Sequence, residues 1–415
     1  MNKAVSVLIF SLVALGGILF AGGPFLVKSS LGLNDSLFSQ FASVFFVESS
    51  TPEILKQAAA SVPFTRQRIR VLVVPGHDDE FWGTQYKDMK EARMTLQLGM
   101  ELEKFLSTDS RLEVITSRGE LGYNPVLATY FKDNEGEILE YVRGKKQIMN
   151  DLMLSGKVYK SEGVFHNKAP DLVAIRLYGI NKWANENDID LVVHIHFNDY
   201  PRRKQDIPGE YSGFSVYVPE RQYSNARASK EVALAVSKRL QTYYQESNMP
   251  KESAGVVEDQ DLIAIGSFNS LDPASILIEY GYIYEPQFFN PEIRSKVISD
   301  MATQTYFGIR DFLDNSEGSS LTKKYSTAFL PHTWKDNISS GVRHNPSVLS
   351  LQAALTLEGL YPPGERNPHE CPLAGIFGAC TKKSVALFQQ KYGISGEKDM
   401  LGEKTREKLN ELYSK

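Results

Sequence analysis

Cysteine is scarce in this sequence, and neither sign of charge dominates it. Only two of the 415 residues are cysteine, which excludes a disulfide-rich scaffold and a four-cysteine zinc site. The 46 basic and 50 acidic residues leave a net charge of −4, so no overall basic field predicts a nucleic-acid partner. The hydrophobic share of 42% is ordinary for a globular protein and excludes a disordered chain or a multi-span membrane protein. The length predicts two or three domains.

The amino terminus carries a long apolar run. Residues 4–27 contain no charged side chain, and Lys3 and Lys28 flank them. About 20 apolar residues can span a bilayer as a helix, and the run exceeds the usual signal-peptide core, so residues 1–28 are predicted to be a membrane anchor. A cleaved signal peptide is the alternative, because small residues in the run offer cleavage sites. Either way, we expect the rest of the chain to act in the periplasm, in the cell wall or outside the cell.

Residues 67–314 alternate short apolar runs with helical patterns, after a Ser-rich spacer at residues 29–66. The alternation is typical of a mainly parallel, twisted α/β sheet with helices on both faces. Residues 119–170 are too long and polar for an ordinary loop, which indicates an insertion with some helix of its own. The predicted strands are residues 70–75, 112–116, 190–195, 215–218 and 275–279, and the predicted helices are residues 88–106, 172–185, 225–246 and 292–313.

Side chains able to bind a metal stand at the ends of three predicted strands. His77 follows the first strand, His196 follows the third, and Glu279 ends the last. Open α/β sheets bind ligands beyond the carboxyl ends of their strands, so we expect these side chains to converge. Glu91 opens the helix after the first strand and can supply a carboxylate. Catalytic zinc commonly takes three His or carboxylate ligands. The alternative is that these residues have structural roles, because their spacing alone does not distinguish the two.

Six stretches between residues 70 and 313 resemble a known family. They read VLVVPGHDDEFWG, KEARMTLQL, VITSR, IRLYGINKWAN, DLVVHIHFND and ILIEYGYI. In order and spacing they resemble the zinc-dependent N-acetylmuramoyl-L-alanine amidases of bacterial cell walls. The resemblance implies that His77, Glu91 and His196 bind Zn²⁺ and that Glu279 is the catalytic general base. It also implies that the substrate is peptidoglycan, cleaved between N-acetylmuramic acid and L-alanine.

The sequence departs from the family pattern near the expected metal. Asp78 and Asp79 replace two glycines after the first histidine, and His194 stands in the place of a serine. His194, Asn198 and Asp78 are candidates for supporting the metal ligands or contacting substrate, and a structural role for His194 is equally compatible. Residues 119–170 either shape the substrate groove or cover the metal. Two other functions stay open: a wall-binding protein that has lost its activity, and a zinc amide hydrolase with a different substrate.

Residues 343–415 form a second unit after a predicted linker at residues 315–342. Their pattern predicts three helices, with Thr381 and Thr405 as helix N-caps. The Leu-Gln, Gly-x-Phe-Gly, Thr and Phe-Gln positions resemble the peptidoglycan-binding module that often accompanies wall hydrolases. A helical bundle with another partner is the alternative.

The two cysteines flank the Gly-x-Phe-Gly turn of this second unit. Cys371 and Cys380 are nine residues apart, and nearby cysteines in an exported protein most often pair. We therefore expect a structural disulfide. A metal site that adds His369 to both thiols is a weaker alternative, because it lacks an evident fourth ligand.

Overall fold

The computed structural model describes residues 48–65, 67–164, 168–200, 203–315 and 328–414. The predicted anchor or signal peptide at residues 1–28 lies outside them, as do much of the predicted spacer and part of the predicted linker. Among the helices within these ranges, none is long and apolar enough to cross a membrane.

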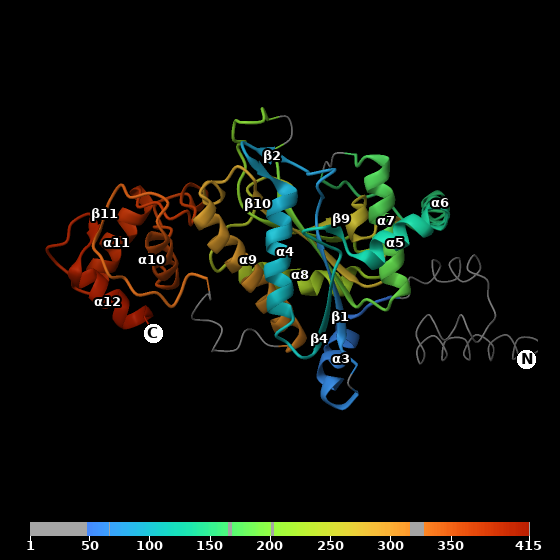
Figure 1. The fold of residues 1–415 in the computed structure, drawn as a ribbon, viewed down its shortest axis with the longest axis horizontal. Coiled ribbons are helices and arrows are strands. Elements are labelled where there is room, and N and C mark those ends of the chain that lie inside the picture. Colours follow the sequence, from blue (N-terminus) through green and yellow to red (C-terminus); the bar gives the residue numbers. More distant parts are fainter. Residues whose placement is uncertain (1–47, 66, 165–167, 201–202, 316–327, 415) are drawn as a thin grey trace, which may run out of the picture.

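A six-stranded sheet forms the centre of the larger unit, in the order β4-β1-β7-β10-β8-β9 (Figure 1). The first four strands run parallel, as predicted, but β8 pairs antiparallel with β10, so the sheet is mixed. Strand β9 was not predicted, because it is short and half of its residues are acidic. The strands are β1 (Ile69–Pro75), β4 (Leu112–Thr116), β7 (Leu191–Asn198), β8 (Ser215–Pro219), β9 (Val256–Asp259) and β10 (Ala274–Tyr282).

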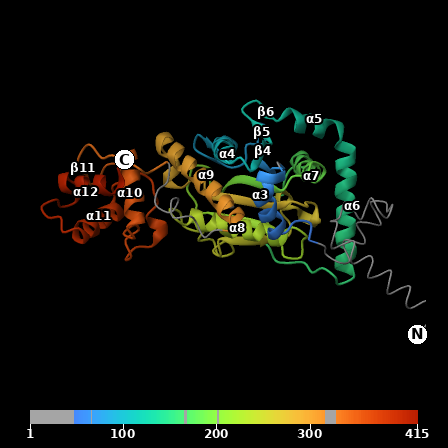
Figure 2. The same ribbon diagram turned by 90° about the horizontal axis from the view of Figure 1, so that it is seen from below.

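Helices cover both faces of the sheet, which explains why its inner strands are apolar on both sides (Figure 2). Val71 and Val73 of β1 point into a core shared with Leu98 of α4. The intervening Leu72 packs in a second core, which includes Trp183 of α7. The first face carries α4 (Glu91–Leu106), α8 (Ala226–Leu240) and α9 (Pro291–Leu313), and the second carries α7 (Asp171–Glu186).

Part of the predicted spacer is a helix, α3 (Pro52–Thr65), which packs against α8, α9 and β1. Its buried Leu55 and Ala59 belong to the main core. Residues 52–65 are therefore a structural part of the larger unit and not a free connection.

The insertion contains a two-stranded hairpin and two helices, α5 (Pro125–Asp133) and α6 (Glu135–Leu154). Both helices pack against α7, and α6 also contacts the turn at Ser267–Asn269. Lys145 Nζ donates a hydrogen bond of 2.9 Å to the carbonyl of Asn269, which fixes α6 there. The insertion thus extends the second face outward beyond α7 (Figure 2).

The second unit contains the three predicted helices, α10 (Pro346–Leu357), α11 (Ala379–Lys391) and α12 (Glu403–Tyr413). Thr381 and Thr405 are not N-caps, because α11 and α12 begin after Gly378 and Gly402. Their buried hydroxyls instead accept hydrogen bonds of 3.0 Å from Gln352 and Gln389, the two glutamines of the sequence pattern. Both threonines therefore join neighbouring helices.

Some residues of the predicted linker pack inside this second unit. Trp334 is 1% exposed, and its indole N–H donates to the carbonyl of Ser347. Cys371 and Cys380 form the expected disulfide. The loop that contains Cys371 reaches the larger unit, where His369 Nδ1 lies 2.9 Å from Ser212 Oγ.

Candidate metal centre

His77 and His196 come together where β1 and β7 end, because these strands are parallel neighbours. His77 comes after β1 and Gly76 and has a positive φ of 63°, a conformation that is uncommon outside glycine. Gly76 allows the close approach, since a Cβ atom there would lie 2.3 Å from the His196 ring. The strand-end argument from the sequence therefore placed both histidines correctly.

Glu91, the first residue of α4, bridges the two imidazoles. Its Oε2 lies 3.1 Å from His77 Nε2, and its Oε1 lies 3.0 Å from His196 Nδ1. One ligand atom from each of the three residues lies within 4.8 Å of the others. The Glu91 side chain is 5% exposed and that of His77 is 28% exposed, so the cluster opens to solvent on one side.

The charges of this cluster suit a divalent cation. Burial by itself raises the pKa of Glu91, but the charges and hydrogen bonds of His77 and His196 outweigh it and hold that pKa below its usual range. Burial lowers the pKa of His196 despite the neighbouring carboxylate. For His77, burial acts downward, but the charge of Glu91 prevails and raises the pKa. Two imidazoles and one carboxylate form a donor set that Zn²⁺ accepts, with a fourth position for water or substrate.

Arg118 connects the two segments that carry the cluster residues. Its buried guanidinium donates to the carbonyls of Pro75 and Gly76 at the end of β1, and to the carbonyl of Ala92 in α4 at 2.7 Å. Arg118 therefore positions the cluster from behind and does not line its open side.

Glu279 lies beside the cluster, on β10, in register with His196 of β7. Its Oε2 is out of contact with solvent and has no hydrogen-bond partner among the described residues. Burial, followed by the charges of Glu91 and Glu252, raises the pKa of Glu279 well above its ordinary value. A carboxylate in such surroundings has a high affinity for a proton, as a general base at neutral pH requires.

Glu252 is a buried carboxylate near this site that the sequence did not point to. Its Oε1 accepts a hydrogen bond of 2.9 Å from Asn198 Nδ2, and its Oε2 accepts one of 2.6 Å from Ser247 Oγ. The hydroxyls of Tyr217 and Tyr282 donate to the same carboxylate. Asn198 is thereby held at the end of β7. No motif marks Glu252, because it lies in a polar loop.

The contacts of the two remaining candidates, His194 and Asp78, indicate structural roles. His194 is fully buried, and burial lowers its pKa to about 3, so its ring is neutral. Asp78 pairs with Arg176 of α7 at 2.9 Å and caps the backbone N–H of Phe81. Asp78 thus stabilises the loop after β1 and is not part of the His77–Glu91–His196 cluster.

Residues 71–311 match the family model described as N-acetylmuramoyl-L-alanine amidase, which is more than half of the chain. The chain belongs to this amidase family. Its members are metal-dependent enzymes of the bacterial cell wall, and the His77–Glu91–His196 cluster of this amidase can hold a metal ion.

Solved structures similar to this amidase include further enzymes of the family. An amidase from Clostridium difficile 630 is 18% identical, with a TM-score of 0.38, over 61% of this chain and all of its own. One from Mycobacterium smegmatis is 16% identical, with a TM-score of 0.39, over 60% of this chain and 99% of its own. No curated protein matches the sequence. The assignment therefore depends on the family model.

Proposed function

We propose that this amidase is a zinc enzyme in which His77, Glu91 and His196 bind the metal and Glu279 is the general base. Its reaction is hydrolysis of the amide between N-acetylmuramic acid and L-alanine in peptidoglycan. The observation that carries the proposal is the bridging of both imidazoles by Glu91, at 3.0 and 3.1 Å, beside the partly buried Glu279.

The protein groups divide the chemistry between them. When bound, zinc supplies a Lewis acid that polarises the amide carbonyl and acidifies water. Glu279 accepts a proton from the attacking water and later donates it to the leaving amine of alanine. Glu252 holds Asn198 beside the reacting groups and, through its charge, favours proton uptake by Glu279.

We further propose that residues 343–415 hold the enzyme on peptidoglycan, and that residues 1–28 bring the chain across the cytoplasmic membrane. The paired contacts Gln352–Thr381 and Gln389–Thr405 support the resemblance of the second unit to a peptidoglycan-binding module, because they explain its sequence pattern. Holding the enzyme on the polymer raises the local concentration of cleavable bonds.

The test is digestion of purified peptidoglycan by the full-length protein, with and without a chelator. We expect peptides with a new amino-terminal alanine, identified by mass, to appear only without chelator and to reappear when zinc is added. Release that persists in the chelated, metal-free protein contradicts the proposal.

A further inference from the structure

An exposed tryptophan and an unpaired lysine lie at the edge of the metal centre. Trp82 is 42% exposed, and Lys90 Nζ lies 4.1 Å from the centroid of its indole ring. Lys90 makes no ion pair with any residue in the described ranges, although it directly precedes the ligand Glu91. We call these two residues the Trp82–Lys90 edge.

The backbone holds this edge firmly against the ligands. Trp82 accepts a hydrogen bond of 3.0 Å from the N–H of Ala92, and Thr84 accepts one of 2.9 Å from the N–H of Glu91. Gly83 lies between them, and a Cβ atom there would be 2.3 Å from Glu91 Oε2 and 2.6 Å from His77. The Trp82 backbone is therefore adjacent to the metal ligands and fixed before substrate arrives, which lowers the entropic cost of binding.

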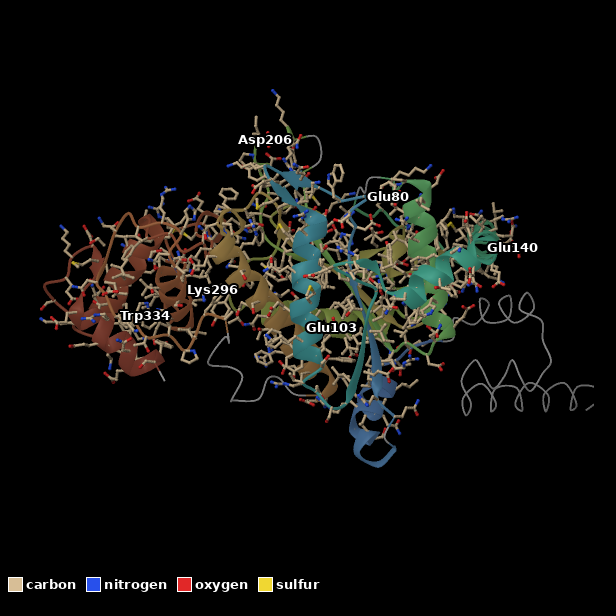
Figure 3. All side chains as sticks on the ribbon, viewed as in Figure 1. Glu80, Glu103, Glu140, Asp206, Lys296 and Trp334 are labelled. Carbon is tan, nitrogen blue, oxygen red and sulfur yellow. A yellow bond between two sulfur atoms is a disulfide. The ribbon has the colours of Figure 1, made fainter. Side chains whose placement is uncertain are left out.

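The opposite side of the centre carries the other sign of charge. Asp78, Asp79 and Glu80 follow His77, and among the residues that the structure describes only Arg176 of α7 forms ion pairs with Asp78 and Glu80, at 2.9 Å each. This acidic segment faces α7, which covers the second face of the sheet, whereas Lys90 directly precedes α4 on the first face. Glu80 stands beside α7, across the strand ends from α4 (Figure 3).

The two halves of the substrate differ in charge in the same way. In N-acetylmuramoyl peptides the sugar is neutral, because its lactyl carboxyl is in the amide that is cleaved, whereas the peptide ends in a carboxylate. A carboxylate is attracted to the Lys90 ammonium and repelled by the acidic segment. An exposed indole also offers apolar surface to a peptide chain.

We propose that the Trp82–Lys90 edge is the subsite for the peptide half of the substrate, with Lys90 pairing with a peptide carboxylate and Trp82 packing on the chain. The inference depends on the proposed function, since it assumes cleavage at the His77–Glu91–His196 cluster. The sugar half then lies on the α7 side, so charge sets the direction in which the substrate binds.

The experiment compares two N-acetylmuramoyl-L-alanyl peptides, one with free carboxylates and one with the same carboxylates converted to amides. For the full-length enzyme we expect a kcat/KM about 1.5-fold to fivefold higher for the acidic peptide, the range of an exposed ion pair. Lys90→Glu should abolish or reverse this preference through KM, with unchanged zinc content, and Lys90→Arg should retain it. Trp82→Ala should raise KM for both peptides.

The matched control is Lys104→Glu, the same change of charge near the far end of α4, about 20 Å away. It should keep the wild-type preference. A wild-type enzyme without the preference, or Lys90→Glu with the preference intact, overturns the subsite. A third outcome is that Lys90→Glu lowers the zinc content of the enzyme and lowers kcat by the same factor for both peptides. In that case Lys90 supports Glu91, and the subsite is also wrong.

A binding measurement separates this inference from the proposed function. Glu279→Gln should bind the acidic peptide more tightly than the amide form by the same factor, and Lys90→Glu in that background should remove the difference. Loss of the binding difference refutes the subsite even if hydrolysis proceeds as proposed. An intact difference without hydrolysis by the wild-type enzyme refutes the catalytic assignment alone.

Discussion

Glu91 and Glu279 both lie where the strands of the sheet end, but their surroundings are opposite. Both oxygens of Glu91 face donors, including the N–H groups of Thr84 and Phe197, and the pKa of this carboxyl is lowered. Glu279 is partly buried near other carboxylates, with Oε2 unpartnered among the described residues, and its pKa is raised. Carboxyl groups with pKa values moved apart in this way typically divide the roles of fixed charge and proton carrier.

Replacing Glu91 should have the largest effect. Glu91→Gln removes the negative charge that joins both imidazoles, so we expect loss of bound zinc and of peptidoglycan cleavage down to the chelated background. Metal analysis of the purified variant, with cleavage measured in parallel, checks this. If the variant retained stoichiometric zinc, Glu91 would not be needed to bind the metal, and the proposed division of roles between Glu91 and Glu279 would be wrong.

Replacing Glu279 should give the next largest effect and leave the metal in place. We expect Glu279→Gln to lower kcat by about 10²–10⁴-fold, the usual contribution of a general base. Zinc content and substrate affinity should stay near wild type, because the side chain keeps its shape. A variant that cleaves peptidoglycan at the wild-type rate would exclude Glu279 as the base.

The pH profile sharpens the comparison further. Because Glu279 must be ionised to accept a proton, its raised pKa places the acidic limb of kcat above the ordinary glutamate value of about 4.3. Glu252→Gln removes a negative charge that raises this pKa, so the limb should move to lower pH. Glu258→Gln is the matched control, since Glu258 pairs with Lys230 and contributes no cause of the shift. A shift in the opposite direction would contradict the electrostatic role of Glu252.

The sequence predicted the parts of this site that depend on strand order. His77 comes after an apolar strand, and His196 and Glu279 lie near the ends of two others. Parallel neighbours bring these strand ends together without any knowledge of side-chain packing. Glu252 could not be predicted, because its place depends on a loop whose hydrogen bonds reach three separate segments. The antiparallel direction of β8 could not be predicted for a related reason, because an apolar run in the sequence does not show in which direction the strand will pair.

The second unit shows the same limit at its start. Trp334 is buried in it and Phe329 is buried against Tyr243 of the larger unit, although polar neighbours made residues 315–342 resemble a linker. Burial of isolated aromatic residues depends on distant contacts, here the carbonyl of Ser347 and the side chain of Asn410. Composition averaged over a stretch therefore places the boundary of such a unit too late.

Removing the disulfide should have the smallest effect on catalysis at the site that contains Glu91 and Glu279. The Cys371–Cys380 bond closes a nine-residue loop, and its loss should destabilise the second unit by about 2–3 kcal/mol in the chain-entropy account. Since Glu91 and Glu279 belong to the amidase fold, the double variant Cys371→Ser/Cys380→Ser should cleave a soluble muramoyl peptide at the wild-type rate. It should lose activity only on intact wall near the temperature at which the second unit melts.

Thermal unfolding followed alongside both assays tests this, with His369→Ala as the control for the contact to Ser212. A lower rate on the soluble peptide in the disulfide variant, but not in His369→Ala, would mean that the second unit acts on the metal centre itself. The opposite surroundings of Glu91 and Glu279 would then depend on the second unit as well as on the amidase fold.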